Sequence, residues 1–243
     1  MENFVFDLYG TLVDIHTDEG AQKFKQKTAK YFARLNPRVT DFFALYKRLC
    51  AEKSSGENCE IDLLSVFREI LTYGGNAVEE GTVLKAAEYF RKQSRSRLKL
   101  YRGVRALLKG LRMRGARLYI LSNAQSCFTV KELEKLKLTE WFDGIEISSD
   151  FGRKKPAPEF FRHIIDKYSL DPEKTVYVGN DFKADILGAK SASLCAAYIK
   201  SNLSPAEDDL AQIKKTADFA TDDFSELFEY LLSFRALVEK SPR

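Results

Sequence analysis

Three short apolar runs in this chain end in polar residues of the types that carry out chemistry. These polar ends are Asp7, Ser122-Asn123 and Gly179-Asn180-Asp181. A carboxylate such as Asp7 can attack phosphorus or carbon and form a covalent intermediate that water later hydrolyses, although taken alone it is better explained as the cap of the next turn. Every buried strand must become polar somewhere, so one such case carries little weight. Three together indicate a shared site.

The elements that would position these residues follow from the pattern of the rest of the chain. From Arg102 onward, short apolar runs alternate with helical patterns, which predicts an α/β fold with a doubly wound, parallel, Rossmann-like sheet. The expected strands are 3–7, 116–123, 144–148, 175–181, 194–199 and 218–220, and the expected helices include 104–114, 159–168 and 224–238. Ligands of such sheets bind beyond the carboxyl ends of the strands. We therefore expect the three polar ends to meet on one rim.

The segment between the first strand and this alternating region has a different texture. From Asp14 to Lys99 the apolar residues recur at spacings of three and four, with breaks at Asn36-Pro37, at Ser54 to Gly56 and at Gly74 to Asn76. This spacing predicts about four helices and no strands. We expect two domains, a core made of residues 1–13 and 100–243 and an inserted helical domain of residues 14–99.

Composition narrows the class of protein. The 243 residues carry a net charge of only +4, which gives no reason to expect nucleic acid or membrane as a partner. The four cysteines form no C-x-x-C pair and are typical of reduced, packed thiols, so we expect a cytoplasmic protein. No apolar run is long enough to span a membrane and no secretory signal is visible. The oligomeric state has no signature in the sequence.

Four motifs in this order resemble those of the haloacid dehalogenase superfamily, whose members are mostly phosphatases, and the resemblance covers the whole chain. The matching segments are Asp7-Leu8-Tyr9-Gly10-Thr11-Leu12, Leu121-Ser122-Asn123, Lys155-Pro156-Ala157-Pro158, and Gly179-Asn180-Asp181 with Asp185 to Ala189. Each motif alone is weak, but all four on the expected strand ends make a strong signal. The inserted helices resemble the cap that this superfamily places between its first and second motifs.

The motifs imply roles for six residues. Asp7 would be the nucleophile, followed by Gly10 in a tight turn and by Thr11 as a hydrogen-bonding and phosphate-binding side chain. A phosphoryl group brings negative charge beside Asp7, and the K-P-x-P spacing selects Lys155, rather than Lys154, as the cation that offsets it. Ser122, with Asn123 beyond it, would donate hydrogen bonds to the phosphoryl oxygens.

A metal site is expected on the same rim. Asp181 and Asp185 are four residues apart at the start of a helical pattern, so one helix face would carry both. With Asp7 they make three carboxylates whose repulsion a dication would relieve, and such oxygen ligands suit Mg²⁺. The resemblance adds the backbone carbonyl of Tyr9. Asn180 stands where many relatives have an aspartate, which leaves open whether Asn180 or Asp181 is the ligand.

Tyr9 is the main departure from the phosphatase pattern. The matching residue in phosphatases is usually an aspartate that acts as general acid, and positioned proton transfer is worth about 10²–10⁴-fold. A tyrosine here resembles the haloacid dehalogenases themselves, in which aspartate attacks carbon and halide leaves without a proton. The acidic fourth motif favours an Mg²⁺-dependent phosphatase of small-molecule phosphate esters. A 2-haloacid dehalogenase, or a weakly active or non-catalytic binding protein, is the alternative.

A basic run at residues 91–99 is the other conspicuous feature. Five of its nine residues are lysine or arginine. Such a run could grip a phosphate or a nucleic acid, but no aromatic residue interleaves it, as a single-strand groove would require. We interpret it as a solvated helix face that leads into the hinge.

Overall fold

The computed structural model of this protein describes residues 2–238. The first residue of the expected core range 1–13 and the last five of the range 100–243, residues 239–243, lie outside the described residues. In the described part, no helix is both long enough and apolar enough to cross a lipid bilayer.

A six-stranded, all-parallel sheet forms the centre of the molecule. Its strands are β1 (Asn3–Phe6), β4 (Arg117–Ser122), β5 (Gly144–Ile147), β6 (Thr175–Gly179), β7 (Cys195–Ile199) and β8 (Phe219–Thr221), and their order across the sheet is β5-β4-β1-β6-β7-β8. The chain runs outward from β1 to β5 and then returns to the other side of β1 for β6 to β8. The order of the strands therefore reverses beside β1, and the expected α/β doubly wound sheet is confirmed.

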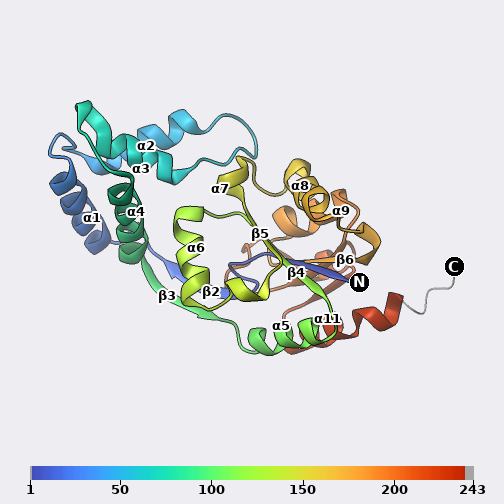
Figure 1. The fold of residues 1–243 in the computed structure, drawn as a ribbon. Helices are drawn as coiled ribbons and strands as arrows, with labels where there is room; N and C mark the ends of the chain where they lie inside the picture. Colours follow the sequence, from blue (N-terminus) through green and yellow to red (C-terminus); the bar gives the residue numbers. More distant parts are fainter. Residues whose placement is uncertain (1, 239–243) are drawn as a thin grey trace.

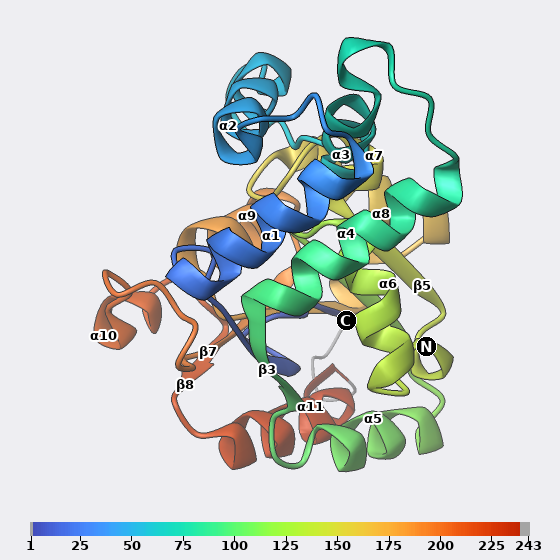
Figure 2. The same ribbon diagram turned by 90° about the vertical axis from the view of Figure 1, so that its left-hand side faces the viewer.

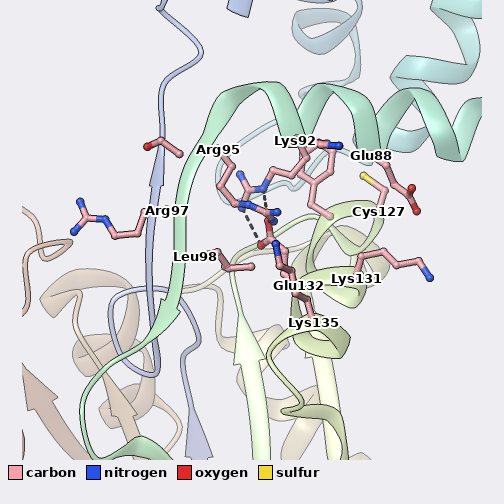
Figure 3. A pocket seen from close by; sticks show the side chains of 12 residues that line it. Glu88, Lys92, Arg95, Arg97, Leu98, Cys127, Lys131, Glu132 and Lys135 are labelled. Carbon is pink, nitrogen blue, oxygen red and sulfur yellow. Dashed lines mark hydrogen bonds and ion pairs between the residues drawn. The ribbon is translucent and has the colours of Figure 1, made fainter.

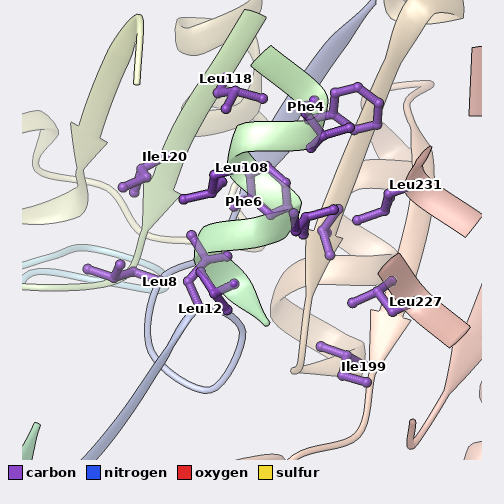
Figure 4. Close-up of a cluster of buried hydrophobic side chains, with 14 of the residues drawn as sticks. Phe4, Phe6, Leu8, Leu12, Leu108, Leu118, Ile120, Ile199, Leu227 and Leu231 are labelled. Atoms are coloured by element: carbon purple, nitrogen blue, oxygen red, sulfur yellow. The ribbon is translucent and has the colours of Figure 1, made fainter. Parts of the chain in front are cut away.

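Successive residues of the strands feed two separate hydrophobic cores. Phe4 and Phe6 of β1 pack with α5 (Val104–Met113) and α11 (Phe224–Val238), whereas Val5 points to the opposite face. Figure 4 shows the first of these cores, with side chains of the sheet meeting those of the two helices. The second core is closed by α8 (Pro158–Tyr168), α9 (Gly188–Ser191) and α10 (Leu210–Ile213). Burial on both faces explains the nearly continuous apolar runs in the sequence.

The first four of the five α-helices between β1 and β4 form a group of their own on one side of the molecule (Figures 1 and 2). They are α1 (Gln22–Leu35), α2 (Phe42–Lys53), α3 (Leu63–Thr72) and α4 (Glu80–Ser94). Asp41 and Asp62 start α2 and α3 by accepting hydrogen bonds from backbone N–H groups of the first turn. A third, phenylalanine-rich core holds the four helices together and includes Phe128 of α6 (Ser126–Lys135).

The prediction of no strands between residues 14 and 99 is wrong. Strand β2 (Val13–Thr17) pairs antiparallel with β3 (Arg95–Leu100), with Val13 opposite Leu100 and Ile15 opposite Leu98. The two strands carry the chain out to the helices and back (Figure 1). In β3 the arginine and lysine residues alternate with serine and leucine, and the high charge of this run hid its period of two.

Short elements complete the chain. They are the helix α7 (Ser148–Phe151), the 3₁₀ turns η1 (Tyr73–Gly75), η2 (Thr139–Trp141) and η3 (Pro172–Lys174), and the wide π-type turn η4 (Phe182–Leu187). Because η4 begins directly after the polar end of β6, it places Asp185 close to the carboxyl end of that strand.

Candidate active site

The loop after β1 places Asp7 at the carboxyl end of the central strand. The Asp7 backbone N–H donates to the Val178 carbonyl of β6 at 2.8 Å, which holds the loop to the sheet. Gly10 has a φ of +94°, and a Cβ atom there would clash with the side chain of Asn180. Thr11 donates from its hydroxyl to Asn180 Oδ1 at 3.2 Å. The Gly-Thr pair therefore locks the loop after β1 against the loop after β6.

Asp7 is buried and lies next to a buried lysine. Lys155 Nζ donates to Asp7 Oδ1 at 2.8 Å, and the Ser122 hydroxyl donates to the same oxygen at 3.2 Å. Burial raises the pKa of Asp7 to about 6, with Lys155 lowering it and the charge of Asp185 raising it. The carboxyl group is therefore ionised at neutral pH, but its ionisation costs more free energy in the folded protein than in water.

Lys155 uses its three N–H groups on three different oxygens. Besides Asp7, it donates to Asp185 Oδ1 at 2.7 Å and to the Tyr177 hydroxyl at 2.7 Å. Burial alone would lower the pKa of Lys155, but the charges of Asp185 and Asp7 raise it, so the ammonium group keeps its charge. Asn123 fixes the backbone of Lys155 from both sides, accepting from its N–H at 2.7 Å and donating to its carbonyl at 3.0 Å.

Asp185 is held by hydrogen bonds to both of its oxygens. Asp185 Oδ2 accepts from the backbone N–H groups of Asn180 at 3.0 Å and Asp181 at 2.9 Å, and Tyr177 donates to Oδ1 at 2.9 Å. Gly179 permits this close packing, since a Cβ atom there would clash with the Asp185 carboxyl group. The Asp181 side chain instead caps η4 by accepting from the Ala184 N–H at 2.7 Å.

The expected group of three carboxylates around a dication is not found. Among residues 2–238, no three His, Cys, Asp or Glu side chains are arranged to hold a metal ion. The reason is that Lys155 stands between Asp7 and Asp185 and neutralises part of their repulsion, while backbone N–H groups occupy the other oxygen of Asp185.

A smaller set of oxygen atoms does fit Mg²⁺. Asp7, Asn180 and Asp181 line one cavity of about 240 Å³. Burial and the charges of Asp185 and Asp208 raise the pKa of Asp181, although the Ala184 N–H opposes them. The cavity thus holds more negative charge than Lys155 balances. Mg²⁺ commonly binds to one or two carboxylates and completes its shell with water and a substrate phosphate, so these donors suit it.

The sequence-predicted residues meet in this cavity, named here the Asp7 cavity. Its lining consists of Asp7, Tyr9, Ser122, Asn123, Lys155, Asn180, Asp181, Ala184, Asp185, Leu203 and Pro205. Of the predicted residues, Thr11 alone does not line it and acts through Asn180. Sequence reasoning missed Tyr177, Leu203 and Pro205, because nothing in a strand interior or in the loop after β7 marks a residue as facing the site.

The hydroxyl group of Tyr9 is hydrogen-bonded to side chains of α6. The hydroxyl donates to Glu132 of α6 in a short hydrogen bond and lies 3.1 Å from the Thr129 hydroxyl. Glu132 also accepts from Arg91 at 2.8 Å and from Arg95 at 2.5 Å (Figure 3). Burial and the charge of Glu132 raise the pKa of Tyr9, so the phenol stays protonated at neutral pH.

Comparison with known proteins agrees with this architecture. A family model for haloacid dehalogenase-like hydrolases matches residues 1–193. The chain is 35% identical to a glyceraldehyde 3-phosphate phosphatase of Methanothermobacter thermautotrophicus over 50% of its own length and 54% of that protein's. It is 27% identical to a glyceraldehyde 3-phosphate phosphatase of Pyrococcus furiosus, over 93% of this chain and 91% of the relative. The first of these matches thus spans only about half of the curated relative.

Solved structures share the fold at low identity. A 2-haloacid dehalogenase from Pseudomonas syringae pv. Tomato has a TM-score of 0.68 at 20% identity and covers 96% of this chain and 99% of its own. An HAD phosphatase from Thermococcus onnurineus has a TM-score of 0.61 at 18% identity, with 95% and 98% covered. At such identities the likeness concerns the fold and does not choose between the two activities. From the family match and the fold together, the chain belongs to the haloacid dehalogenase-like hydrolases.

Proposed function

We propose that this protein is an Mg²⁺-dependent phosphatase of small-molecule phosphate esters that works through an aspartyl-phosphate intermediate. The observation that carries the proposal is the Asp7 cavity itself. There, an ionised carboxylate at a strand end lies 2.8 Å from a buried ammonium group and 3.2 Å from a serine hydroxyl. The phosphatase names of the relatives support the same choice.

The first chemical step uses groups already in place. Both side-chain hydrogen bonds to Asp7 reach Oδ1, and we assign the attack on phosphorus to Oδ2. The new bond joins Oδ2 to phosphorus as the bond to the leaving oxygen breaks, so the electron pair leaves on an alkoxide or aryloxide oxygen, which takes its proton from water. Lys155 and Ser122 turn their N–H and O–H groups to the phosphoryl oxygens, where they stabilise the charge of the transition state.

The second step returns the enzyme to its starting state. Water attacks phosphorus, the bond to Asp7 breaks, and inorganic phosphate leaves with the carboxylate restored. When bound, Mg²⁺ would offset the added phosphoryl charge. We propose that Asp7, Asp181 and the Tyr9 carbonyl hold it, with Asn180 as a further oxygen donor. Asp185 then serves as the anchor of Lys155.

We do not expect Tyr9 to act as a general acid that protonates the leaving group. The Tyr9 hydroxyl is committed to Glu132, and its raised pKa keeps it a poor source of protons. We therefore expect esters with good leaving groups, such as aryl and acyl phosphates, to react faster than alkyl phosphates.

The helices α1–α4 are proposed to act as a cap domain that selects the substrate. They have their own core, they are joined to the sheet region by the paired strands β2 and β3, and they touch it again through α6. The expected division into residues 14–99 and the remainder supports this proposal, with β2 and β3 as the hinge.

A 2-haloacid dehalogenase is the second candidate. The protonated Tyr9 in place of an acid and the direct contact of Lys155 with Asp7 and Asp185 favour it, because halide needs no proton and no metal to leave. Against it stands Asp181, which adds a third carboxylate to the Asp7 cavity.

The deciding experiment is a substrate screen in two buffers. Purified protein is assayed against p-nitrophenyl phosphate, acetyl phosphate, alkyl phosphates and 2-chloropropionate, with Mg²⁺ or with excess chelator. The proposal predicts phosphate release that needs Mg²⁺ and no halide release. Chloride release that persists in chelator would assign the dehalogenase reaction, and hydrolysis of none of these compounds would favour a binding protein.

A further inference from the structure

A second concave region lies beside the Asp7 cavity and shares none of its lining residues. This region, named here the basic crevice, has a volume of about 860 Å³, within the usual range for small-molecule sites. It opens between α4 with β3 on one side and α6 on the other (Figure 3). Its lining is Glu88, Arg91, Lys92, Arg95, Ser96, Arg97, Leu98, Cys127, Phe128, Lys131, Glu132 and Lys135.

Two of its six cations are committed elsewhere. Arg97 pairs with Asp14 at 3.2 Å and points away from Glu132 in Figure 3. Lys131 pairs with Glu134 of its own helix at 3.1 Å. By contrast, Lys92 and Lys135 have no ion pair within residues 2–238.

The two remaining cations are partly buried and share one acid. The side chains of Arg91 and Arg95 are each only 16% exposed, and both donate to Glu132 Oε1. Burial opposes the charge of Glu132, but the hydrogen bonds from Arg91, Tyr9 and Arg95 lower its pKa, so this carboxylate is ionised. One carboxylate balances one of the two guanidinium groups. Since each guanidinium has five N–H donors, a single carboxylate leaves most of them for other acceptors.

We propose that the basic crevice is a binding site for a small polyanion that carries at least two phosphate or carboxylate groups. Four available cations, Arg91, Lys92, Arg95 and Lys135, share its lining with two acids, Glu88 and Glu132, and a third acid, Glu19, lies near Arg91. The forked donors of Arg91 and Arg95 match the planar pairs of oxygens that carboxylates and phosphates present. The two lysines at the rim supply charge to a second anionic group of the same ligand.

The proposal does not depend on the reaction assigned to Asp7. An anion that enters the Asp7 cavity meets three carboxylates and one lysine, so we expect it to need a divalent cation there. In the basic crevice the excess charge is already positive. Anion binding in buffer freed of divalent cations therefore distinguishes the basic crevice from the Asp7 cavity.

The test is isothermal titration calorimetry of the full chain with pyrophosphate and with citrate, at fixed ionic strength and in buffer freed of divalent cations with an insoluble chelating resin. Citrate has no phosphoryl group, so its binding cannot be substrate binding of the proposed kind. The changed protein is Lys92→Gln/Lys135→Gln, whose altered side chains are exposed. A matched control is Lys109→Gln/Lys214→Gln, which removes the same charge from exposed positions on α5 and after α10. Ser122→Ala reports on the Asp7 cavity.

We expect saturable binding of both anions to the wild-type protein, about tenfold weaker binding to Lys92→Gln/Lys135→Gln, and unchanged binding to the control and to Ser122→Ala. An equal loss in the control would mean that only net charge matters. A loss confined to Ser122→Ala would place the anion at Asp7. Either result, or no binding to the wild type at millimolar concentration, would overturn the proposal.

Discussion

In the Asp7 cavity three carboxylates share one buried cation, whereas in the basic crevice two partly buried guanidinium groups share one carboxylate. Burial raises the pKa of all three carboxyl groups, and it prevails at Asp7, where the pKa is about 6, and at Asp181. At Glu132 the hydrogen bonds from Arg91, Tyr9 and Arg95 and the charge of Arg91 outweigh burial, so its pKa is lowered. The comparison shows that the presence of ion pairs does not by itself determine whether a site is positive or negative. The charge that is in excess determines the net charge of each region, and therefore which ligand that region can accept.

The largest expected effect comes from removing the nucleophile. Asp7→Asn keeps the shape of the side chain but replaces the carboxylate with a far weaker nucleophile, so kcat for aryl phosphate should fall by at least about 10⁴-fold. Steady-state kinetics with p-nitrophenyl phosphate measure it. Near wild-type turnover by the folded variant would show that the chemistry of the Asp7 cavity does not run through this residue.

Removing the cation of the Asp7 cavity should cost more stability than removing one cation of the crevice. Lys155→Met leaves Asp7 and Asp185 buried beside each other, and an unpaired buried charge costs about 3–5 kcal/mol. Arg95→Gln still leaves Arg91 on Glu132, so its cost should be smaller. Urea unfolding of both variants, with Lys154→Met as the control, checks the order. Equal losses in the free energy of unfolding for Lys155→Met and Arg95→Gln would mean that the Asp7 cavity does not depend on its cation more than the basic crevice does.

The raised pKa of Asp7 predicts a pH-dependent gain in stability from Asp7→Asn in metal-free buffer. The folded-state pKa of about 6 lies above the ordinary 3.8, so ionisation of Asp7 favours the unfolded chain. The penalty is absent below pH 4, grows between pH 4 and 6 and is complete above pH 6, where it amounts to at most about 3 kcal/mol. Melting curves of wild type and variant should therefore converge in acid and separate above pH 6. A wild type that is the more stable protein at pH 7 would contradict this account.

The smallest effect on catalysis is expected from a change at Tyr9, which lines the Asp7 cavity and is hydrogen-bonded to Glu132 of the basic crevice. Tyr9→Phe removes the hydroxyl that donates to Glu132, and a hydrogen bond to a charged group contributes about 1.5–3 kcal/mol. We expect a loss of stability of that size or less and a change in kcat below about threefold, because the hydroxyl is hydrogen-bonded to side chains of α6. Tyr73→Phe, at an exposed tyrosine, is the control for stability. A hundredfold loss of kcat would instead make Tyr9 the general acid.

The sequence was sufficient to predict the frame of the site. The strands ending at Asp7, Ser122 and Gly179 were recognisable from their apolar runs, and the parallel arrangement required their ends to meet. The motif resemblance added Lys155, which lies on a loop with no periodic signal. These predictions concern local patterns and topology, which one sequence records.

The arrangement within the site was not predictable in the same way. Side-chain packing places Lys155 between Asp7 and Asp185. It also places Tyr177 beside them. Glu132 gave no signal, because a glutamate on an amphipathic helix is ordinarily solvated. Strand β3 was missed because its alternation was carried by charged residues. Such features depend on partners that are not neighbours along the chain, as Ile15 opposite Leu98 illustrates.

The central claim is that a phosphoryl group is transferred to Asp7. The most direct measurement is an acid quench of the enzyme during turnover of acetyl phosphate with Mg²⁺, followed by digestion and mass spectrometry of the peptide that contains Asp7. The account predicts one added phosphoryl group on this peptide, absent from Asp7→Asn and removed by hydroxylamine. Steady turnover without that label, or a label on any other peptide, would contradict it.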